Sequence, residues 1–398
     1  MHLINSSKNT MPKRNVLIAS LILALLAAAT VSTALAQTSG QESSKPQQQA
    51  PPPAAGGPQG DIGPIVIPKK AEEPPEPKPE APKKVEGMPD FSIRKDVPLV
   101  NVPVMVLTKN GQFVPGLKKD NFKVLEDGVP QKIANFSQME DAPITAVLLV
   151  EFAANNYAFM VDALNASYTF AQTLKPQDWI AVVSYDMRPH LLTDFTQDKR
   201  AVYGALNQLR IPGFSETNLF DALYDTLDRL DGVEGRKYII LISTGRDTFS
   251  KLTYDQILKK VQATKNVTIF SISTGEAFRM WVDANYGTNP DVSMAMMDYL
   301  QADNEMNTFA KMTGGRWYKP RMEGELPDIF HDIAASIRNQ YSLSYYPTNN
   351  KQDGSYRKLK VELQAPDGGP LTIKDQKGKN LKVQIIARDG YRSKHEVE

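Results

Sequence analysis

The sequence contains no cysteine among its 398 residues. This absence excludes disulfide bonds, thiol catalysis, zinc sites built on cysteine and a lipid anchor attached to cysteine. Histidine is scarce as well, and the four present are widely separated: His2, His190, His331 and His395. No metal-binding spacing, Gly-rich phosphate loop or nucleophile elbow occurs in the sequence. We therefore expect a protein that is not an enzyme.

A strong excess of charge of either sign is also lacking. The chain has 46 Lys and Arg against 45 Asp and Glu, which gives a formal net charge of +1. A near-neutral chain has no electrostatic footprint for nucleic acid. We therefore expect a protein partner rather than DNA or RNA.

One long hydrophobic run stands near the N-terminus, at residues 16–36. Lys13 and Arg14 precede it, and small residues end it at Ala34 and Ala36. A charged start, an apolar middle and a small-residue cleavage site are the three parts of a secretory signal. We predict that residues 1–36 are a signal peptide and that the protein is secreted, periplasmic or in the cell envelope. The alternative is an uncleaved anchor, since the run is about long enough to span a bilayer; any membrane attachment is expected only through this segment.

Residues 37–89 hold 13 of the 28 prolines and almost no apolar side chains. Such a composition cannot bury a core, so we predict a disordered, Pro-rich linker. Its second half, residues 69–84, alternates Pro with Lys and Glu, which favours an extended, semi-rigid spacer. The spacer would hold a folded head away from an envelope surface, and a passive solubilising linker is the alternative.

Two stretches of β character enclose the central part of the chain. Residues 90–142 are predicted to form a small β element, with Pro98 and Pro103 indicating an edge or bulged strand and Asn110-Gly111 a type I′ hairpin turn. Residues 340–398 read as short strands joined by Asn, Asp and Gly turns. We expect the two flanks to combine in one sandwich-like element.

Between the flanks, residues 143–339 alternate strands with helices. The strands lack polar alternation, as expected when both faces of a sheet are covered; they are residues 146–150, 179–184, 238–242 and 267–272. The helical patterns are residues 159–174, 199–209, 219–230, 254–263 and 326–337. We predict the α/β class, with a Rossmann-like, doubly wound and mostly parallel sheet.

A long connection at residues 278–312 carries six methionines: Met280, Met294, Met296, Met297, Met306 and Met312. Flexible thioethers suit adaptable protein contact surfaces. Methionine at helical spacing is also typical of a core, and both interpretations stay open.

Three turns close apolar strands and carry polar side chains. In a doubly wound sheet, ligands gather at the carboxyl ends of the strands. We therefore expect these turns to converge on one binding surface, the strand-end rim, which consists of Glu151, Asn155, Thr217, Arg246 and Asp247.

The three turns resemble the metal-ion site of the von Willebrand factor type A family. In that family the first turn reads Asp-x-Ser-x-Ser, the second supplies a Thr and the third an Asp before Gly. The matching positions here are Glu151, Ala153, Asn155, Thr217 and Thr244, of which only Thr217 is unchanged. The resemblance implies one divalent cation whose open coordination position takes a carboxylate from a partner protein.

The chemistry at these positions predicts that the metal site is degenerate. Glu151, Asn155 and Thr217 still offer oxygen ligands of the kind that Mg²⁺ or Ca²⁺ prefers. Ala153 offers no oxygen, however, and Thr244 removes a negative charge. We predict no obligatory cofactor, and a weakened Mg²⁺ or Ca²⁺ site is the alternative.

Further motifs stand on both sides of the three turns. They are VPGL at 114–117, FKVLEDG at 122–128, TGGRW at 313–317 and YSLSYYP at 341–347. In this order they resemble the acidobacterial subgroup of von Willebrand factor type A related proteins. The resemblance covers roughly residues 97–393 and implies a secreted or envelope binding module rather than a defined reaction.

The sequence as a whole favours an exported, non-enzymatic protein-binding module that contacts its partner through the strand-end rim. Arg246 would then receive a partner carboxylate directly, in place of a metal ion. Two alternatives remain: a Mg²⁺- or Ca²⁺-dependent adhesion module with a weakened site, and a structural envelope scaffold in which the spacer and the β tail matter more than the rim.

Overall fold

The computed structural model describes residues 99–139, 142–154, 164, 167–286, 290–374 and 377–394. The predicted signal peptide and linker lie outside these residues, and so does Asn155. Residues 90–398 form one unit of the chain. Within the described part, no helix combines the length and the apolar character needed to cross a bilayer.

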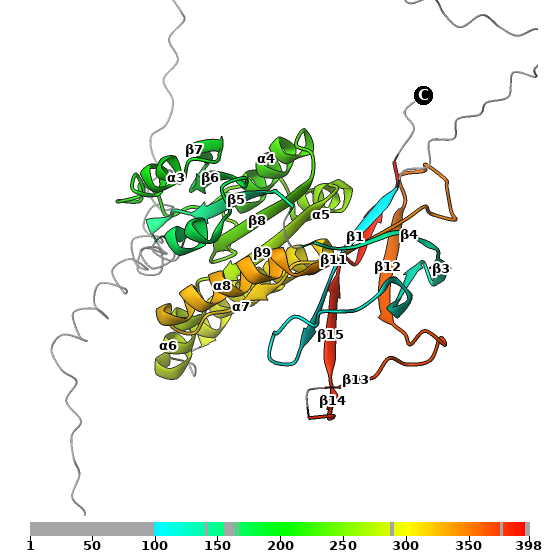
Figure 1. Ribbon diagram of the computed structural model, residues 1–398. Helices are drawn as coiled ribbons and strands as arrows, with labels where there is room; N and C mark the ends of the chain where they lie inside the picture. Colours follow the sequence, from blue (N-terminus) through cyan, green and yellow to red (C-terminus); the bar gives the residue numbers. More distant parts are fainter. Residues whose placement is uncertain are drawn as a thin grey trace, which may run out of the picture. The chain divides into compact units, whose positions relative to one another are not determined.

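A six-stranded sheet forms the centre of this unit, in the order β10-β9-β8-β5-β6-β7 (Figure 1). Its strands are β5 (Ile144–Glu151), β6 (Trp179–Tyr185), β7 (Pro189–Thr196), β8 (Arg236–Ser243), β9 (Val267–Ser273) and β10 (Trp317–Tyr318). All neighbours are parallel except the edge strand β7. Every residue of β5 and β9 is buried, in keeping with their mainly apolar sequences.

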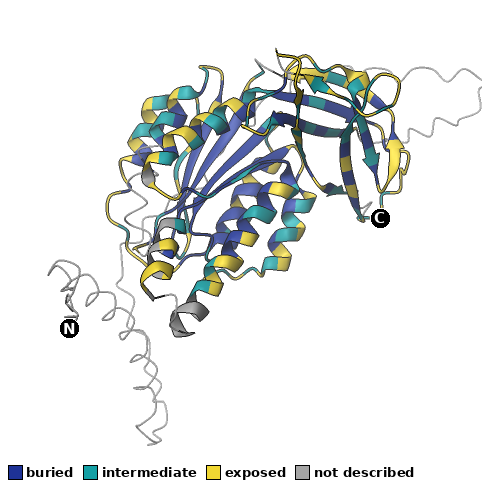
Figure 2. Cartoon of the chain, turned by 90° about the horizontal axis from the view of Figure 1, so that it is seen from below, coloured by how far each residue is buried: buried dark blue, intermediate teal, exposed yellow. Residues whose placement is uncertain are grey.

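Helices cover both faces of this sheet. They are α3 (Lys199–Leu206), α4 (Leu219–Asp231), α5 (Tyr254–Ala263), α6 (Glu276–Tyr286), α7 (Pro290–Thr313) and α8 (Leu326–Arg338). Leu148 of β5 faces a core with α3 and α8, whereas Leu149 faces a second core with α4, α5 and α7. Figure 2 shows the strands buried between helices whose outer faces are exposed. The predicted Rossmann-like α/β fold is confirmed.

The flanks of the chain build two further four-stranded antiparallel sheets. One has the order β15-β1-β11-β4, from β15 (Val383–Ala387), β1 (Val100–Thr108), β11 (Gln340–Tyr345) and β4 (Ile133–Met139). The other has the order β16-β12-β2-β3, from β16 (Gly390–Arg392), β12 (Tyr356–Leu363), β2 (Phe122–Glu126) and β3 (Val129–Gln131). Short pieces complete the set: β13 (Ile373–Lys374), β14 (Asn380–Leu381), and the 3₁₀ turns η1 (Lys119–Asn121) and η3 (Glu323–Glu325).

These two sheets share one apolar core. Val102 and Val104 of β1 pack in it with Val124 of β2, Leu343 of β11 and Val361 of β12. Strands from before and after the central sheet therefore form a single sandwich-like element, as the sequence predicts.

Strand β1 bears out the edge position predicted for Pro103 and corrects the predicted turn, and Pro98 lies outside the described residues. The strand has neighbours on both sides, but β15 pairs with it only from Val104 onward, so Pro103 lies where β1 has one neighbour. The turn after β1 is a three-residue loop rather than a type I′ turn, because Thr108 bonds with Gln112 and only Gly111 has a positive φ.

Candidate functional site

The carboxyl ends of β5, β6 and β8 meet at a buried polar cluster, the Glu151 cluster, made of Glu151, Tyr185, Ser243 and Thr244. The Glu151 side chain is 1% exposed. Its carboxylate accepts hydrogen bonds from Ser243 Oγ at 2.7 Å, from the Thr244 backbone N–H at 2.7 Å and from Thr244 Oγ1 at 2.9 Å. The Tyr185 hydroxyl in turn donates to Ser243 Oγ at 2.7 Å. Each of these three strand ends thus contributes a buried polar side chain to the cluster.

Burial dominates the ionisation of this cluster. It raises the pKa of Glu151, although the bonds from Ser243 and Thr244 and the charge of Arg246 act in the opposite direction. Burial also raises the pKa of Tyr185, with a further contribution from the charge of Glu151. The cluster therefore favours a protonated carboxyl group more than an exposed site would.

Thr217 is fully buried beside the same strand ends. Its hydroxyl donates to the backbone carbonyl of Arg246 at 2.6 Å, and its own backbone N–H donates to Thr248 Oγ1 at 2.9 Å. The Thr217 carbonyl also accepts from the backbone N–H groups of Thr248 and Phe249. Thr217 therefore fastens the loop that follows β8.

These contacts decide how well the site fits a divalent cation. Both oxygens of Glu151 already accept hydrogen bonds, and Thr217 donates its hydroxyl proton within the protein. Ala153 is buried and supplies no oxygen. In the part of the chain that the structure describes, no group of three or more acidic or His side chains is placed to hold a metal. Of the candidate ligands that the structure describes, Glu151 and Thr217 are thus engaged in bonds within the protein, whereas a hard metal ion needs oxygen ligands that face it.

Arg246 and Asp247 lie in the loop after β8, and both are half-buried. The Arg246 guanidinium lies 5.1 Å from the centre of the Tyr299 ring, a cation–π contact that orients it. Asp247 Oδ1 accepts from the Phe220 backbone N–H at 3.2 Å and from Ser250 Oγ at 2.6 Å. Asp247 therefore caps the start of α4, and burial raises its pKa.

The strand-end rim therefore differs from the one expected. Glu151 and Thr217 lie beneath the surface and are not placed to touch a partner. The Asp247 carboxylate caps the start of α4. Of the described residues of the rim, Arg246 is therefore the one whose charged group is available at the surface. Asn155 lies outside the described residues.

A hollow of about 350 Å³ opens beside Arg246. Arg246, Asp247 and Thr248 line it from the loop, and Asp298 and Glu305 line it from α7. Burial and the charge of Asp247 raise the pKa of Glu305. The α7 residues could not be assigned to the site from the sequence, because a helix was not predicted at residues 290–313.

Two half-exposed phenylalanines stand at the same end of the sheet. Phe214 is 51% exposed and Phe249 is 50% exposed. The Phe214 carbonyl accepts from the Ala154 backbone N–H at 2.7 Å, and the Phe249 N–H donates to Thr217. Both are thus fixed to the backbone around the Glu151 cluster. Their place at the strand ends could not be predicted from the sequence, in which each is simply an aromatic residue in a polar loop.

One protein-family model matches a region in the central part of the chain. Residues 155–319 match the model of the von Willebrand factor type A domain family. Similar solved structures include the vWF domain of the type V pili tip protein Mfa5 from Porphyromonas gingivalis, at 14% identity and a TM-score of 0.37, covering 50% of this chain and 96% of that one. A von Willebrand factor type A structure from Catenulispora acidiphila has 12% identity and a TM-score of 0.38, covering 76% and 75%. No curated protein matches the chain.

Proposed function

We propose that this chain, with its von Willebrand factor A domain, is an exported, non-enzymatic protein-binding module that needs no metal to bind its partner. The domain match at residues 155–319 supports an interaction role. The observation that carries the proposal is the exposure of Phe214 and Phe249 at the strand ends, where Arg246 also reaches the surface. Aromatic residues, Phe included, and Arg are enriched in protein interfaces relative to the rest of the surface.

Arg246 supplies the positive charge that a metal ion would otherwise provide. Its guanidinium is held over Tyr299, and it lies near enough to Glu151 to lower the pKa of that carboxyl. A guanidinium can form two parallel hydrogen bonds with a carboxylate. In this proposal an acidic side chain of the partner pairs with Arg246 while its apolar neighbours contact Phe214 and Phe249.

Export and presentation complete the proposal. The N-terminal signal peptide would direct the chain to the periplasm, the cell envelope or the exterior, and residues 37–89 would hold the binding unit away from the surface. Contact with a membrane would be limited to the signal or anchor segment.

Site-specific photo-crosslinking tests the binding surface. A photoreactive phenylalanine analogue is placed at position 249 or, as the control, at the similarly exposed Tyr346, which directly follows β11. We expect a discrete crosslinked partner from position 249 only, and Arg246→Ala should weaken the purified complex by about tenfold or more, as expected for an interface anchor. Crosslinking to the same partner from both positions, or an unchanged affinity in Arg246→Ala, would contradict the proposal.

A chelator distinguishes this function from metal-bridged adhesion. EDTA should leave the complex intact, and calorimetric titration of Mg²⁺, Ca²⁺ or Mn²⁺ into the full chain should give no saturable binding at millimolar concentrations. Saturable binding that is lost in Thr217→Ala would instead favour the adhesion module with a weakened metal site.

A further inference from the structure

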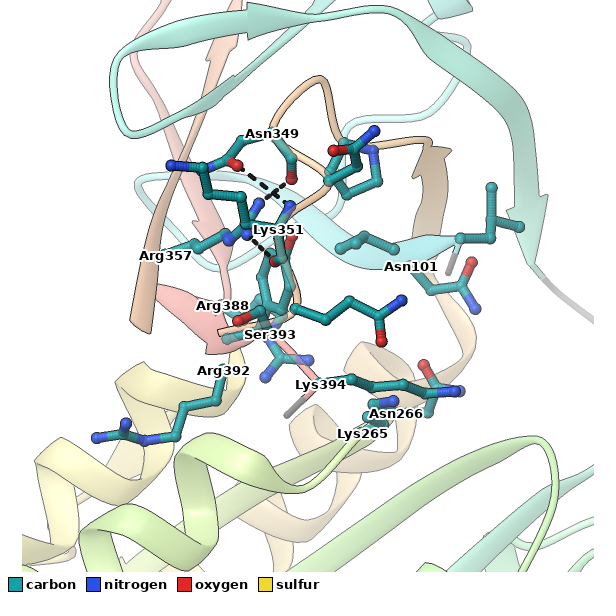
Figure 3. A pocket seen from close by; sticks show the side chains of 16 residues that line it. Asn101, Lys265, Asn266, Asn349, Lys351, Arg357, Arg388, Arg392, Ser393 and Lys394 are labelled. Carbon is teal, nitrogen blue, oxygen red and sulfur yellow. Dashed lines mark hydrogen bonds between the residues drawn. The ribbon is translucent and has the colours of Figure 1, made fainter. Parts of the chain in front are cut away.

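A second pocket lies away from the strand-end rim, beside the turn that connects α5 to β9 (Figure 3). Its volume is about 90 Å³. Lys265 and Asn266 line it from that turn, Asn101 from β1, and residues 349–352 from the loop before β12. Arg388 and residues 391–394, around β16, complete the wall. The pocket shares no residue with the rim, so the two sites can be tested separately.

The lining of this pocket is strongly basic. It includes Lys265, Lys351, Lys394, Arg357, Arg388 and Arg392, and no carboxylate is among its lining residues. Within the described part of the chain, Arg357 alone among these six forms an ion pair, with Glu126 at 3.1 Å. Arg388 donates to the carbonyl of Gly390, and Arg392 donates to the side-chain carbonyl of Gln262. Neutral acceptors satisfy hydrogen bonds but leave the positive charges uncompensated.

Two of the arginines are deeply buried. Arg357 is 2% exposed, and its Nε is a buried donor without a hydrogen-bond partner. Arg388 is also buried, and burial lowers its pKa. A buried cation and an unmet buried donor both cost free energy unless a counter-charge or an acceptor is supplied. Arg357 already pairs with Glu126, so an anion in the pocket would supply its Nε with an acceptor and would supply Arg388 with a counter-charge.

The lysines add a second source of positive potential. Figure 3 shows Lys394 next to Lys265 and Asn266 at one side of the pocket, while Arg392 points away from it. Burial lowers the pKa of Lys265, and the charge of Lys394 lowers it further, against an opposing effect of Asp231. Asp353 borders the site through a bond from Ser393 Oγ at 2.9 Å. Among the described residues, Asp353 together with Glu126 and Asp231 leaves the six basic side chains of the lining in excess.

The size of the pocket limits the class of ligand. A volume of about 90 Å³ holds a small ion or one functional group rather than a protein segment. Lysines act as point charges toward phosphate, and arginines and amides donate several hydrogen bonds to tetrahedral oxyanions. We propose that this pocket binds a compact, multiply charged oxyanion, namely a phosphate or sulfate group.

Calorimetric titration of inorganic phosphate into the full chain tests the proposal, with sodium chloride keeping the ionic strength constant. The variant pair Lys265→Gln/Lys394→Gln removes two lining charges. The pair Lys259→Gln/Lys358→Gln removes two exposed charges outside the pocket, and so matches the change in net charge. We expect saturable binding that weakens about tenfold or more in the first pair, since charge-assisted hydrogen bonds are lost. Binding by the control pair should be unchanged.

Three results would overturn the proposal. These are the absence of saturable heat, equal weakening in both variant pairs, and acetate binding as tightly as phosphate. Sulfate is expected to compete with phosphate. Glycerol phosphate distinguishes the source of the group, because tighter binding of this ester than of the free ion would indicate an oxyanion carried on an organic molecule. If the first pair fails to fold, Lys351→Gln serves as the lining variant.

Discussion

Glu151 ends β5 at the first position of the resembled metal turn, and donors from the end of β8 occupy its carboxylate. Ser243 and Thr244 follow one another in the chain, so a single turn satisfies both oxygens. The bonds and the burial act in opposite directions on the carboxyl pKa, and the burial is the larger effect. The Glu151 side chain thus connects the end of β5 to the end of β8 inside the protein.

The first prediction concerns the pH dependence of stability. The folded-state pKa of Glu151 lies above its ordinary value of 4.5, so the folded protein binds a proton there that the unfolded chain releases more readily. The stabilising contribution of Glu151 is therefore complete below pH 4.5 and is lost as the pH rises through the folded-state pKa. Glu151→Gln should remove this loss. The free energy of unfolding of the variant should therefore fall less than that of the wild type between pH 4 and pH 8, about the range over which such a group titrates.

Urea unfolding of both proteins across this range measures the difference. Asp247 and Glu305, whose pKa values burial also raises, are present in both proteins and cancel in the comparison. The same pH dependence in wild type and Glu151→Gln would contradict the assignment. Glu151→Ala is the matched disruptive variant, and it should cost at least about 2 kcal/mol because it leaves buried donors without an acceptor.

The loop after β8 and the start of α4 form one hydrogen-bonded element. Asp247 accepts from the backbone of Phe220 in the first turn of α4, whereas the side chain of Asn218, the N-cap residue, makes no capping bond. In the reverse direction, Asp221 of α4 accepts from the backbone N–H groups of Lys251 and Leu252. The loop that carries Arg246 and Phe249 is therefore fixed at both ends.

The second prediction tests Asp247 as a helix cap contributed by another segment. Asp247→Ala should lower the free energy of unfolding by about 1 kcal/mol, the usual cost of a lost N-cap. Asp247→Asn keeps an oxygen acceptor and should lose less. Hydrogen exchange at the Phe220 amide should accelerate in the Ala variant and report the broken bond directly.

Asp255→Ala provides the matched control for this prediction. Asp255 lies in the first turn of α5 and is exposed, so only a weak interaction with the helix dipole is removed, about 0.5 kcal/mol. An Asp247→Ala effect no larger than that of Asp255→Ala would show that the cap contributes little.

The whole unit is connected through β1 and a buried polar centre in the flanking sheets. Met105 and Leu107 of β1 belong to the core of the central sheet, while Val104 and Val106 face the sandwich core. Glu126 of β2 pairs with Arg357, and its other oxygen accepts from the hydroxyls of Tyr345 and Tyr391. Glu126 thus joins strands that precede the central domain to strands that follow it.

The third prediction is that this centre stabilises the central sheet as well. Glu126→Gln leaves Arg357 buried without its counter-charge, which should cost about 3 kcal/mol. The tryptophans, Trp179, Trp281 and Trp317, all belong to the central part of the chain, so their fluorescence reports unfolding there. We expect Glu126→Gln to lower the urea midpoint measured by this fluorescence.

Glu362→Gln is the control, because it breaks an exposed pair with Lys360 that should contribute little. The flanking sheets would unfold on their own if two results were found together. The urea midpoint from tryptophan fluorescence would be unchanged in Glu126→Gln, and circular dichroism would show a separate transition at lower urea concentration.

Much of the fold could be predicted because its signals are local. The buried strands at 146–150 and 267–272 and the helix at 254–263 follow from the spacing of apolar residues, and the structure has them at nearly the same bounds. The edge strand β7 and the long helix α7 were missed. β7 is half-exposed with no unbroken apolar run, and apolar residues are spread around α7 rather than confined to one face.

The candidate site was predicted in place but not in detail. Glu151, Thr217 and Arg246 do meet at the strand ends, because the carboxyl ends of parallel strands share one edge of a sheet. Their burial was not predictable, since it depends on which side chains from other turns fill the space. Phe249 and Glu305 were missed for the same reason: each acquires its place from a loop or helix distant in sequence.

The sequence by itself determined the α/β class, the helices on both faces and the position of the three strand-end turns, because these depend on the periodicity of neighbouring residues. Only the tertiary structure decided that the Glu151 carboxylate bonds to Ser243, 92 residues away, and that Lys265 and Lys394 line one pocket. Hydrogen bonds and burial are properties of contacts between distant segments, and the chemistry of both sites depends on them.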